Sequence, residues 1–100
     1  MAKIISINPA TEEIFSEHEE ISSESLQNLV DAARSDTTWR NTLIDTRVQL
    51  LSCLSKELLE HKEHLARTIT QEMGKAITQS RHEIELAASR TNALCNYCVA

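Results

Sequence analysis

This chain of 100 residues contains only one glycine, Gly74, and only one proline, Pro9. Tight turns, glycine-rich phosphate loops and nucleophile elbows depend on these two residue types. The sequence therefore excludes a complete nucleotide-dependent active site of those kinds. Only Phe15, Trp39 and Tyr97 are aromatic, so any core consists mainly of leucine, isoleucine, valine and alanine, which favours helices.

The single glycine lies in the stretch TITQEMGKAITQSRHE, residues 68–83, with helix-forming residues on both sides. A glycine inside a helix costs about 1 kcal/mol relative to alanine. The stretch therefore predicts a break between two helices. We expect Gly74 at the C′ position after Met73, with a positive φ.

Hydrophobic spacing predicts one β-hairpin followed by three helical segments. The segments KIISIN and EEIFSE are typical of short strands, and Asn8 with Pro9 favours a turn between them. Apolar residues at helical spacing follow. The expected bounds are about 3–17 for the hairpin and about 23–40, 43–73 and 76–100 for the helices.

Local signals refine the helix bounds. Ser22 or Ser23 is a candidate N-cap of the first helix. Thr42, with Asp45 three residues later, resembles a capping box that opens the second. The charged stretch 60–64 has no apolar residue and can bend or divide that second helix.

Each predicted helix carries an apolar stripe that the rest of the chain is too small to cover. An isolated two-stranded hairpin is also marginal in water. The fold class expected is mainly α with a short N-terminal β-hairpin, either as a small bundle or as a helical layer on a sheet that lies elsewhere. The chain is therefore expected to be a piece of something larger.

The net charge and the hydropathy of the chain limit the classes of binding partner and the cellular compartment that we expect for it. The formal net charge of −5 argues against non-specific binding to nucleic acid or to acidic lipid. No apolar run approaches the roughly 20 residues that a bilayer span needs, and the first ten residues do not resemble a signal peptide. We expect a cytoplasmic chain in which Cys53, Cys95 and Cys98 are free thiols.

Two clusters have the spacing of chemical sites. Cys95 and Cys98 form a C-x-x-C pair, but a structural zinc site needs a second pair of ligands. We expect two reduced, metal-free thiols near a helical stripe. The acidic run 12–24 is expected to be solvated rather than a contact for a basic partner.

The second cluster is HKEH, residues 61–64. His61 and His64 lie one helical turn apart near Glu57, Glu60 and Glu63, a set that could hold a divalent metal. The spacings 57–61, 60–64 and 63–67 are also those of ordinary i,i+4 pairs on an exposed helix face. We favour the exposed face, and neither His18 nor His82 has a partner that the sequence predicts.

Three ordered features resemble the amino-terminal region of the aldehyde dehydrogenase superfamily. INPAT, residues 7–11, resembles the family's opening hairpin. Trp39-Arg40, then Arg47 and the leucine-rich segment ending in EMGK, resemble its first long helices, and AITQSRHEIELAA resembles the next helix. TLIDTR and ITQEMGKAITQSRHEI look most like the succinate-semialdehyde dehydrogenase branch.

The resemblance implies an enzyme several times longer than this chain. In that family a cysteine thiolate attacks an aldehyde, hydride passes to NAD or NADP, and a glutamate activates the water that releases the acid. These motifs and the dinucleotide-contacting loops lie downstream of the matched region. Residues 1–100 are thus expected to be the N-terminal helical part of the cofactor-binding domain of an α/β fold.

No catalytic, cofactor-binding or metal-binding residue is assigned to this chain. None of the three cysteines matches the family's nucleophile, and Glu72 with Lys75 matches a structural E-x-G-K segment. The chain alone is expected to bind no cofactor. Its expected partners are the remainder of the dehydrogenase fold or a second copy of itself, and the parent enzyme is expected to be a homo-oligomer.

Three positions depart from the family pattern. Glu12 stands where the hairpin usually has glycine, Leu43 where a helix often starts with proline, and Ala76 where proline commonly follows G-K. An alternative hypothesis is a stand-alone helical module that binds a protein partner through its exposed stripe. Cysteine and glutamate motifs encoded downstream of codon 100 would favour the dehydrogenase.

Overall fold

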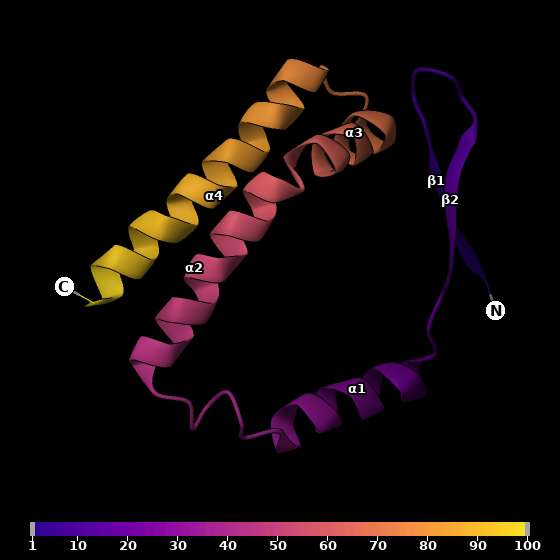
Figure 1. Ribbon diagram of the computed structural model, residues 1–100. Helices are drawn as coiled ribbons and strands as arrows, with labels where there is room; N and C mark the ends of the chain where they lie inside the picture. Colours follow the sequence, from indigo (N-terminus) through magenta and orange to yellow (C-terminus); the bar gives the residue numbers. More distant parts are fainter. Residues whose placement is uncertain (1, 100) are drawn as a thin grey trace.

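The computed structural model describes residues 2–99 as a two-stranded hairpin and four helices (Figure 1). The elements, in chain order, are β1 (Lys3–Ile7), β2 (Ile14–Glu19), α1 (Ser23–Ser35), α2 (Ile44–Glu60), α3 (Lys62–Met73) and α4 (Ile77–Val99). The predicted class, mainly α with an N-terminal hairpin, is confirmed. The predicted end of the last helix, Ala100, lies outside the described residues.

The hairpin pairs β1 and β2 antiparallel, from Lys3 opposite Glu19 to Ile7 opposite Ile14, with an irregularity between Ser6 and Ile7. The second strand continues two residues beyond the predicted end at 17. In the turn, Glu12 has a φ of 63°. Glu12 thus occupies the left-handed region where the resembled family usually has glycine.

Helix α1 begins as predicted and ends earlier. Ser22 is the N-cap, and its Oγ accepts a hydrogen bond from the Ser25 N–H at 3.1 Å. The predicted end at 40 is wrong, because Asp36 has extended backbone angles. The Asp36 carboxylate accepts the Thr38 N–H at 2.9 Å, a local side-chain bond that competes with further helix.

The predicted single helix 43–73 is divided at His61 into α2 and α3. His61 has φ −97° and ψ 12°, and it lies in the charged stretch 60–64, where the sequence allows a bend or a division. The capping box is wrong: Leu43 is the N-cap without a side-chain bond, and the Thr42 hydroxyl donates to the Thr38 carbonyl at 2.7 Å. That local bond uses the hydroxyl that a capping box would need.

Gly74 ends α3 in the left-handed conformation, with φ 71° and ψ 14°, and its N–H donates to the Thr70 carbonyl at 2.9 Å. The predicted break and positive φ are confirmed. A Cβ at this position would lie 2.7 Å from Cγ of Pro9 in the hairpin turn. Only glycine satisfies both the backbone conformation and the close approach.

The core lies where α4 packs against α2 and α3. Its fully buried residues are small, and two of them are serines. Ser55 on α2 donates to the Ala88 carbonyl on α4 at 2.9 Å, and the hydroxyls of Ser80 and Thr70 lie 2.9 Å apart. Small side chains let the helices approach closely, and the hydroxyls satisfy their own hydrogen bonds there. The buried residues are Ser55, Ala66, Ser80, Ile84, Ala88 and Cys95.

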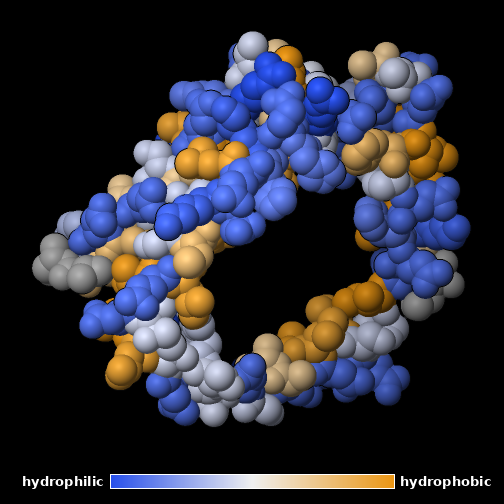
Figure 2. Space-filling model, viewed as in Figure 1, coloured by the Kyte–Doolittle hydropathy of each residue, from blue (hydrophilic) through white to orange (hydrophobic). Residues whose placement is uncertain are grey.

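The described chain is thin and open. Its Cα radius of gyration is 17.8 Å and its extents are 47 × 40 × 17 Å, whereas a compact domain of this length has a radius of gyration of about 13 Å. The space-filling view in Figure 2 shows an opening, which is bounded by the hairpin, α1, α2 and α3 as labelled in Figure 1. None of the described helices is both long and apolar enough to cross a membrane.

Candidate functional site

The three cysteines are free thiols that differ in burial. Cys53 on α2 and Cys98 on α4 are exposed, whereas Cys95 is buried between the helices. Within residues 2–99, no group of three or more side chains of the metal-binding types is placed to hold a metal ion. That both thiols of the C-x-x-C pair stay reduced and metal-free remains a prediction.

The histidine and glutamate cluster opens onto solvent. His61 Nε2 lies 3.3 Å from the Glu57 carboxylate, which is one of the predicted i,i+4 pairs. Glu63 also pairs with Arg67 as predicted, at 3.5 Å. The structure thus agrees with an exposed helix face carrying ordinary ion pairs.

Glu63 has a second partner that helical spacing could not predict. The Arg81 guanidinium on α4 donates to both carboxylate oxygens, at 2.7 and 2.9 Å. Hydrogen bonds from Arg81, with a smaller contribution from Arg67, lower the pKa of Glu63 to about 2. The same pair raises the pKa of Arg81.

Two further ion pairs join α4 to α3 and to the linker that precedes α4. Lys62 donates to Glu85 at 2.9 Å, and this hydrogen bond lowers the pKa of Glu85. Lys75 pairs with Glu83. Because all these groups are exposed, their ion pairs orient the helices relative to one another and do not place a charge in a buried site.

Residues of the E-x-G-K segment contact both the hairpin and α4. Glu72 accepts a hydrogen bond from the Ser6 hydroxyl at 3.0 Å, which joins the end of α3 to the hairpin. Gly74 makes room for Pro9, and Lys75 turns to Glu83 on α4. The segment fixes three elements relative to one another.

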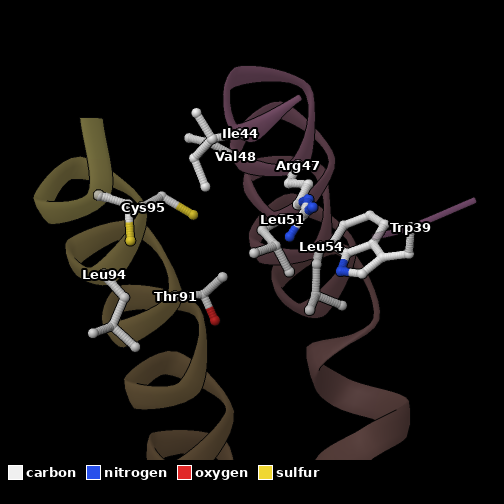
Figure 3. Close-up of a pocket in the computed structure, with 10 residues that line it drawn as sticks. Trp39, Ile44, Arg47, Val48, Leu51, Leu54, Thr91, Leu94 and Cys95 are labelled. Atoms are coloured by element: carbon white, nitrogen blue, oxygen red, sulfur yellow. The ribbon is translucent and has the colours of Figure 1, made fainter. Parts of the chain in front are cut away.

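An apolar depression lies between α2, α4 and the loop before α2. Its volume is about 390 Å³. In Figure 3 the side chains of Val48 and Leu51 from α2 and of Thr91 from α4 point toward it. Its full lining is Trp39, Ile44, Arg47, Val48, Leu51, Leu54, Thr91, Leu94, Cys95 and Cys98.

Arg47 holds one rim of this groove. Its guanidinium lies 5.5 Å from the centre of the Trp39 ring and donates to the carbonyls of Arg40 and Thr42, at 2.6 and 2.9 Å. These bonds and this contact engage the Arg47 guanidinium within the chain. The groove therefore presents a mainly apolar surface.

Sequence reasoning missed the groove and the part that Arg47 plays in it. The spacing from Trp39 to Arg47 crosses a loop, so no helical period relates them. Ser55 could have been found, because it falls beside Leu54 on the apolar stripe of α2, where a polar residue needs an interhelical partner. The bond from Arg81 to Glu63 had no such signal, since it joins two helices across a turn.

The comparisons with known proteins identify one family over nearly the whole chain. The model of the aldehyde dehydrogenase family matches residues 2–99. Succinate semialdehyde dehydrogenase (NAD(P)+) Sad of Escherichia coli (strain K12) is 38% identical over 94 residues, 93% of this chain and 20% of that protein. Malonate-semialdehyde dehydrogenase 2 of Geobacillus kaustophilus (strain HTA426) is 37% identical over 79 residues, 78% of this chain and 16% of that protein.

Solved structures show the same backbone arrangement. Glyceraldehyde-3-phosphate dehydrogenase GapN from Methanocaldococcus jannaschii, complexed with NADP, superposes with a TM-score of 0.87 at 27% identity, covering 94% of this chain and 21% of that one. Betaine aldehyde dehydrogenase from Staphylococcus aureus, at 22% identity and a TM-score of 0.89, shares the fold over 96% of this chain and 20% of its own.

The described chain thus spans between 16% and 21% of the length of these relatives. Its hairpin, its four helices and the E-x-G-K turn agree with the resemblance drawn from the sequence. The chain belongs to the aldehyde dehydrogenase family.

Proposed function

We propose that this chain is the first, mainly helical part of the cofactor-binding domain of an NAD(P)-dependent aldehyde dehydrogenase. By itself it neither binds NAD or NADP nor oxidises an aldehyde. One observation carries the proposal: the family match runs from residue 2 to residue 99, while the chain spans about a fifth of the curated relatives. The stand-alone interaction module is not favoured.

The parent reaction is the oxidation of an aldehyde to a carboxylic acid. Relatives named for succinate semialdehyde and malonate semialdehyde favour a short aldehyde that also carries a carboxylate. The name of the first relative includes NAD(P)+, and the archaeal structure contains NADP, so either nicotinamide cofactor fits the parent.

The chain's own residues support this division of labour. Glu63 and Glu85 are paired with arginine and lysine across helices, and the buried polar residues, Ser55 and Ser80, bond other helices. Hydride transfer needs a cofactor and a substrate held in register, which accounts for about 7 to 11 kcal/mol of barrier lowering. These residues instead hold the helices in place, and another part of the fold positions the cofactor and the substrate.

The proposed partner is the remainder of the dehydrogenase fold, in a cytoplasmic parent enzyme that is a homo-oligomer. The exposed apolar side chains on α1, α2 and α4 support such a partner, because a large contiguous apolar patch on a protein marks an interaction surface.

A chimera tests the proposal. Residues 2–99 of this chain would replace the matched segment of the Escherichia coli succinate semialdehyde dehydrogenase, and NADP-dependent and NAD-dependent oxidation of succinate semialdehyde would be measured. The control is the same enzyme with that segment deleted. We expect turnover from the chimera and none from the control; a chimera that folds cooperatively but has no turnover contradicts the proposal.

A further inference from the structure

Strand β1 has a free edge. The sheet has two strands, and within residues 2–99 no third strand pairs with β1. The hairpin stands apart from the α2–α4 pair, and the bond from Ser6 to Glu72 joins it to the end of α3 (Figure 1). Three isoleucines of β1 are exposed: Ile4, Ile5 and Ile7. The edge of such a strand carries unpaired N–H and C=O groups, which are a template for another strand.

The register of the hairpin shows which backbone groups point outward. The Glu20 N–H donates to the Ala2 carbonyl at 3.0 Å, so these two residues form a hydrogen-bonded pair. Hydrogen-bonded and non-hydrogen-bonded pairs alternate along an antiparallel ladder. Ile4 therefore bonds β2, whereas Lys3 and Ile5 direct their N–H and C=O groups away from it. We call the outward groups of Lys3 and Ile5 the β1 edge.

The two edges of the hairpin differ in charge. Lys3 is the only charged residue of β1, and its ammonium group lies 3.0 Å from the Glu17 carboxylate of β2. Strand β2 itself carries Glu17 and Glu19, with Glu13 before it and Glu20 after it. Like charges on paired strands are destabilising, and charged side chains protect an edge strand from pairing. The edge of β2 is therefore protected, and the β1 edge is not.

We propose that the β1 edge pairs with the β1 edge of a second copy of this chain. Antiparallel pairing centred on Ile5 is symmetric and uses the outward groups, with Ile5 opposite its equivalent and Lys3 opposite Ile7 of the second copy. The two Lys3 side chains then lie about 14 Å apart along the strands, farther than the Debye length of about 10 Å. The product is a four-stranded sheet in the order β2–β1–β1–β2, whose two acidic outer edges prevent further growth.

The dimer is weak, because β1 has only five residues. Interfaces that bury less than about 1,200 Å² are typical of transient complexes, so we expect a dissociation constant between about 10 µM and about 1 mM. Pairing of the hairpins requires neither a cofactor nor the rest of the enzyme. It therefore does not depend on the proposed function, and turnover of the chimera does not test it.

Analytical ultracentrifugation of the 100-residue chain measures the dimer. Reducing conditions exclude a disulfide between the exposed thiols of Cys53 or Cys98. From about 10 µM to about 1 mM, we expect a change from monomer toward dimer without larger species.

A matched pair of substitutions locates the interface. Ile5→Lys places two ammonium groups opposite each other at the centre of the pairing, so we expect the dissociation constant to rise about 10-fold or more. Ile14→Lys places the same group on β2 and should change the constant less than about threefold. Both variants make the formal net charge of −5 less negative, which by itself weakens repulsion between copies. A weaker dimer in Ile5→Lys alone is therefore an effect of the β1 edge.

An NMR contact identifies the register without a substitution. In the proposed pairing, Ile4 lies opposite Ser6 of the second copy as a non-hydrogen-bonded pair, in which the Cα atoms are about 4.5 Å apart. In an equal mixture of isotope-labelled and unlabelled chain, we expect an intermolecular nuclear Overhauser effect between the Hα atoms of these two residues.

Three results would overturn the proposal. The first is a chain that stays monomeric at about 1 mM. The second is a dimer that Ile5→Lys weakens no more than Ile14→Lys does. The third is intermolecular contact between β1 and β2, or growth beyond the dimer, either of which would identify the acidic strand of the second copy as the occupant.

Discussion

At the scale of single residues, Gly74 is constrained by its backbone and by a neighbour. Its φ of 71° lies in the left-handed region, and a Cβ there would lie 2.7 Å from Cγ of Pro9. The first constraint has a local cause, a lone glycine between helix-forming residues, whereas the second joins the hairpin turn to the end of α3 across most of the chain.

Gly74→Ala should lower the free energy of unfolding of the chain by about 2 kcal/mol. About 1 kcal/mol comes from a non-glycine residue at positive φ, and the rest from crowding between the new Cβ and the Pro9 ring. Urea denaturation would measure the loss. In a Pro9→Ala background, which removes the Cγ at 2.7 Å, the cost should fall to about 1 kcal/mol. An equal cost in both backgrounds contradicts the contact.

At the scale of elements, helical periods located the helices, and competing local hydrogen bonds decided where they end. The Asp36 carboxylate stops α1 by bonding Thr38, and the Thr42 hydroxyl bonds Thr38 instead of capping α2. The free energy of such a bond is similar to the differences in helix propensity. A pattern of apolar residues therefore does not predict where a helix ends. The pairing of helices through Ser55 and through Glu63 required the tertiary structure.

Ser55→Ala should destabilise the packing of α2 on α4. The variant removes the donor to the Ala88 carbonyl from a buried site, so we expect a loss of about 1 kcal/mol in the free energy of unfolding. Ser55→Leu should cost about 3 kcal/mol, because the close approach leaves no room for a larger side chain. Ser89→Ala, at an exposed serine of α4, is the control and should stay within about 0.5 kcal/mol.

The Glu63 pairs with Arg81 and Arg67 predict an acid-sensitive link between α3 and α4. The carboxyl has a pKa of about 2 in the folded chain and an ordinary value of 4.5. A lowered pKa gives stability that is complete above pH 4.5 and is lost as the pH falls toward 2. Urea midpoints measured from pH 6 to pH 2 should decline in that window, and Glu63→Gln should flatten the decline. An unchanged slope in the variant would assign the acid sensitivity to other carboxylates.

At the scale of the whole molecule, the thin open shape agrees with a chain that spans about a fifth of the first relative it matches. The uncovered stripes were predictable from hydrophobic spacing, because three apolar faces in 100 residues exceed what one hairpin can cover. The arrangement of those faces around an opening was not predictable, because few contacts within residues 2–99 hold α1 to the other elements. We expect cofactor binding and chemistry to lie in the part of the enzyme that these faces pack against.

The most direct test is a calorimetric titration of the purified 100-residue chain with NAD and with NADP, combined with an assay of succinate semialdehyde oxidation. We expect no saturable heat with either cofactor and no cofactor-dependent turnover, because the chain spans only about a fifth of the first relative it matches and the guanidinium groups of Arg47 and Arg81 bond atoms of the chain itself. Saturable binding of either cofactor, or turnover that depends on one, would contradict this expectation.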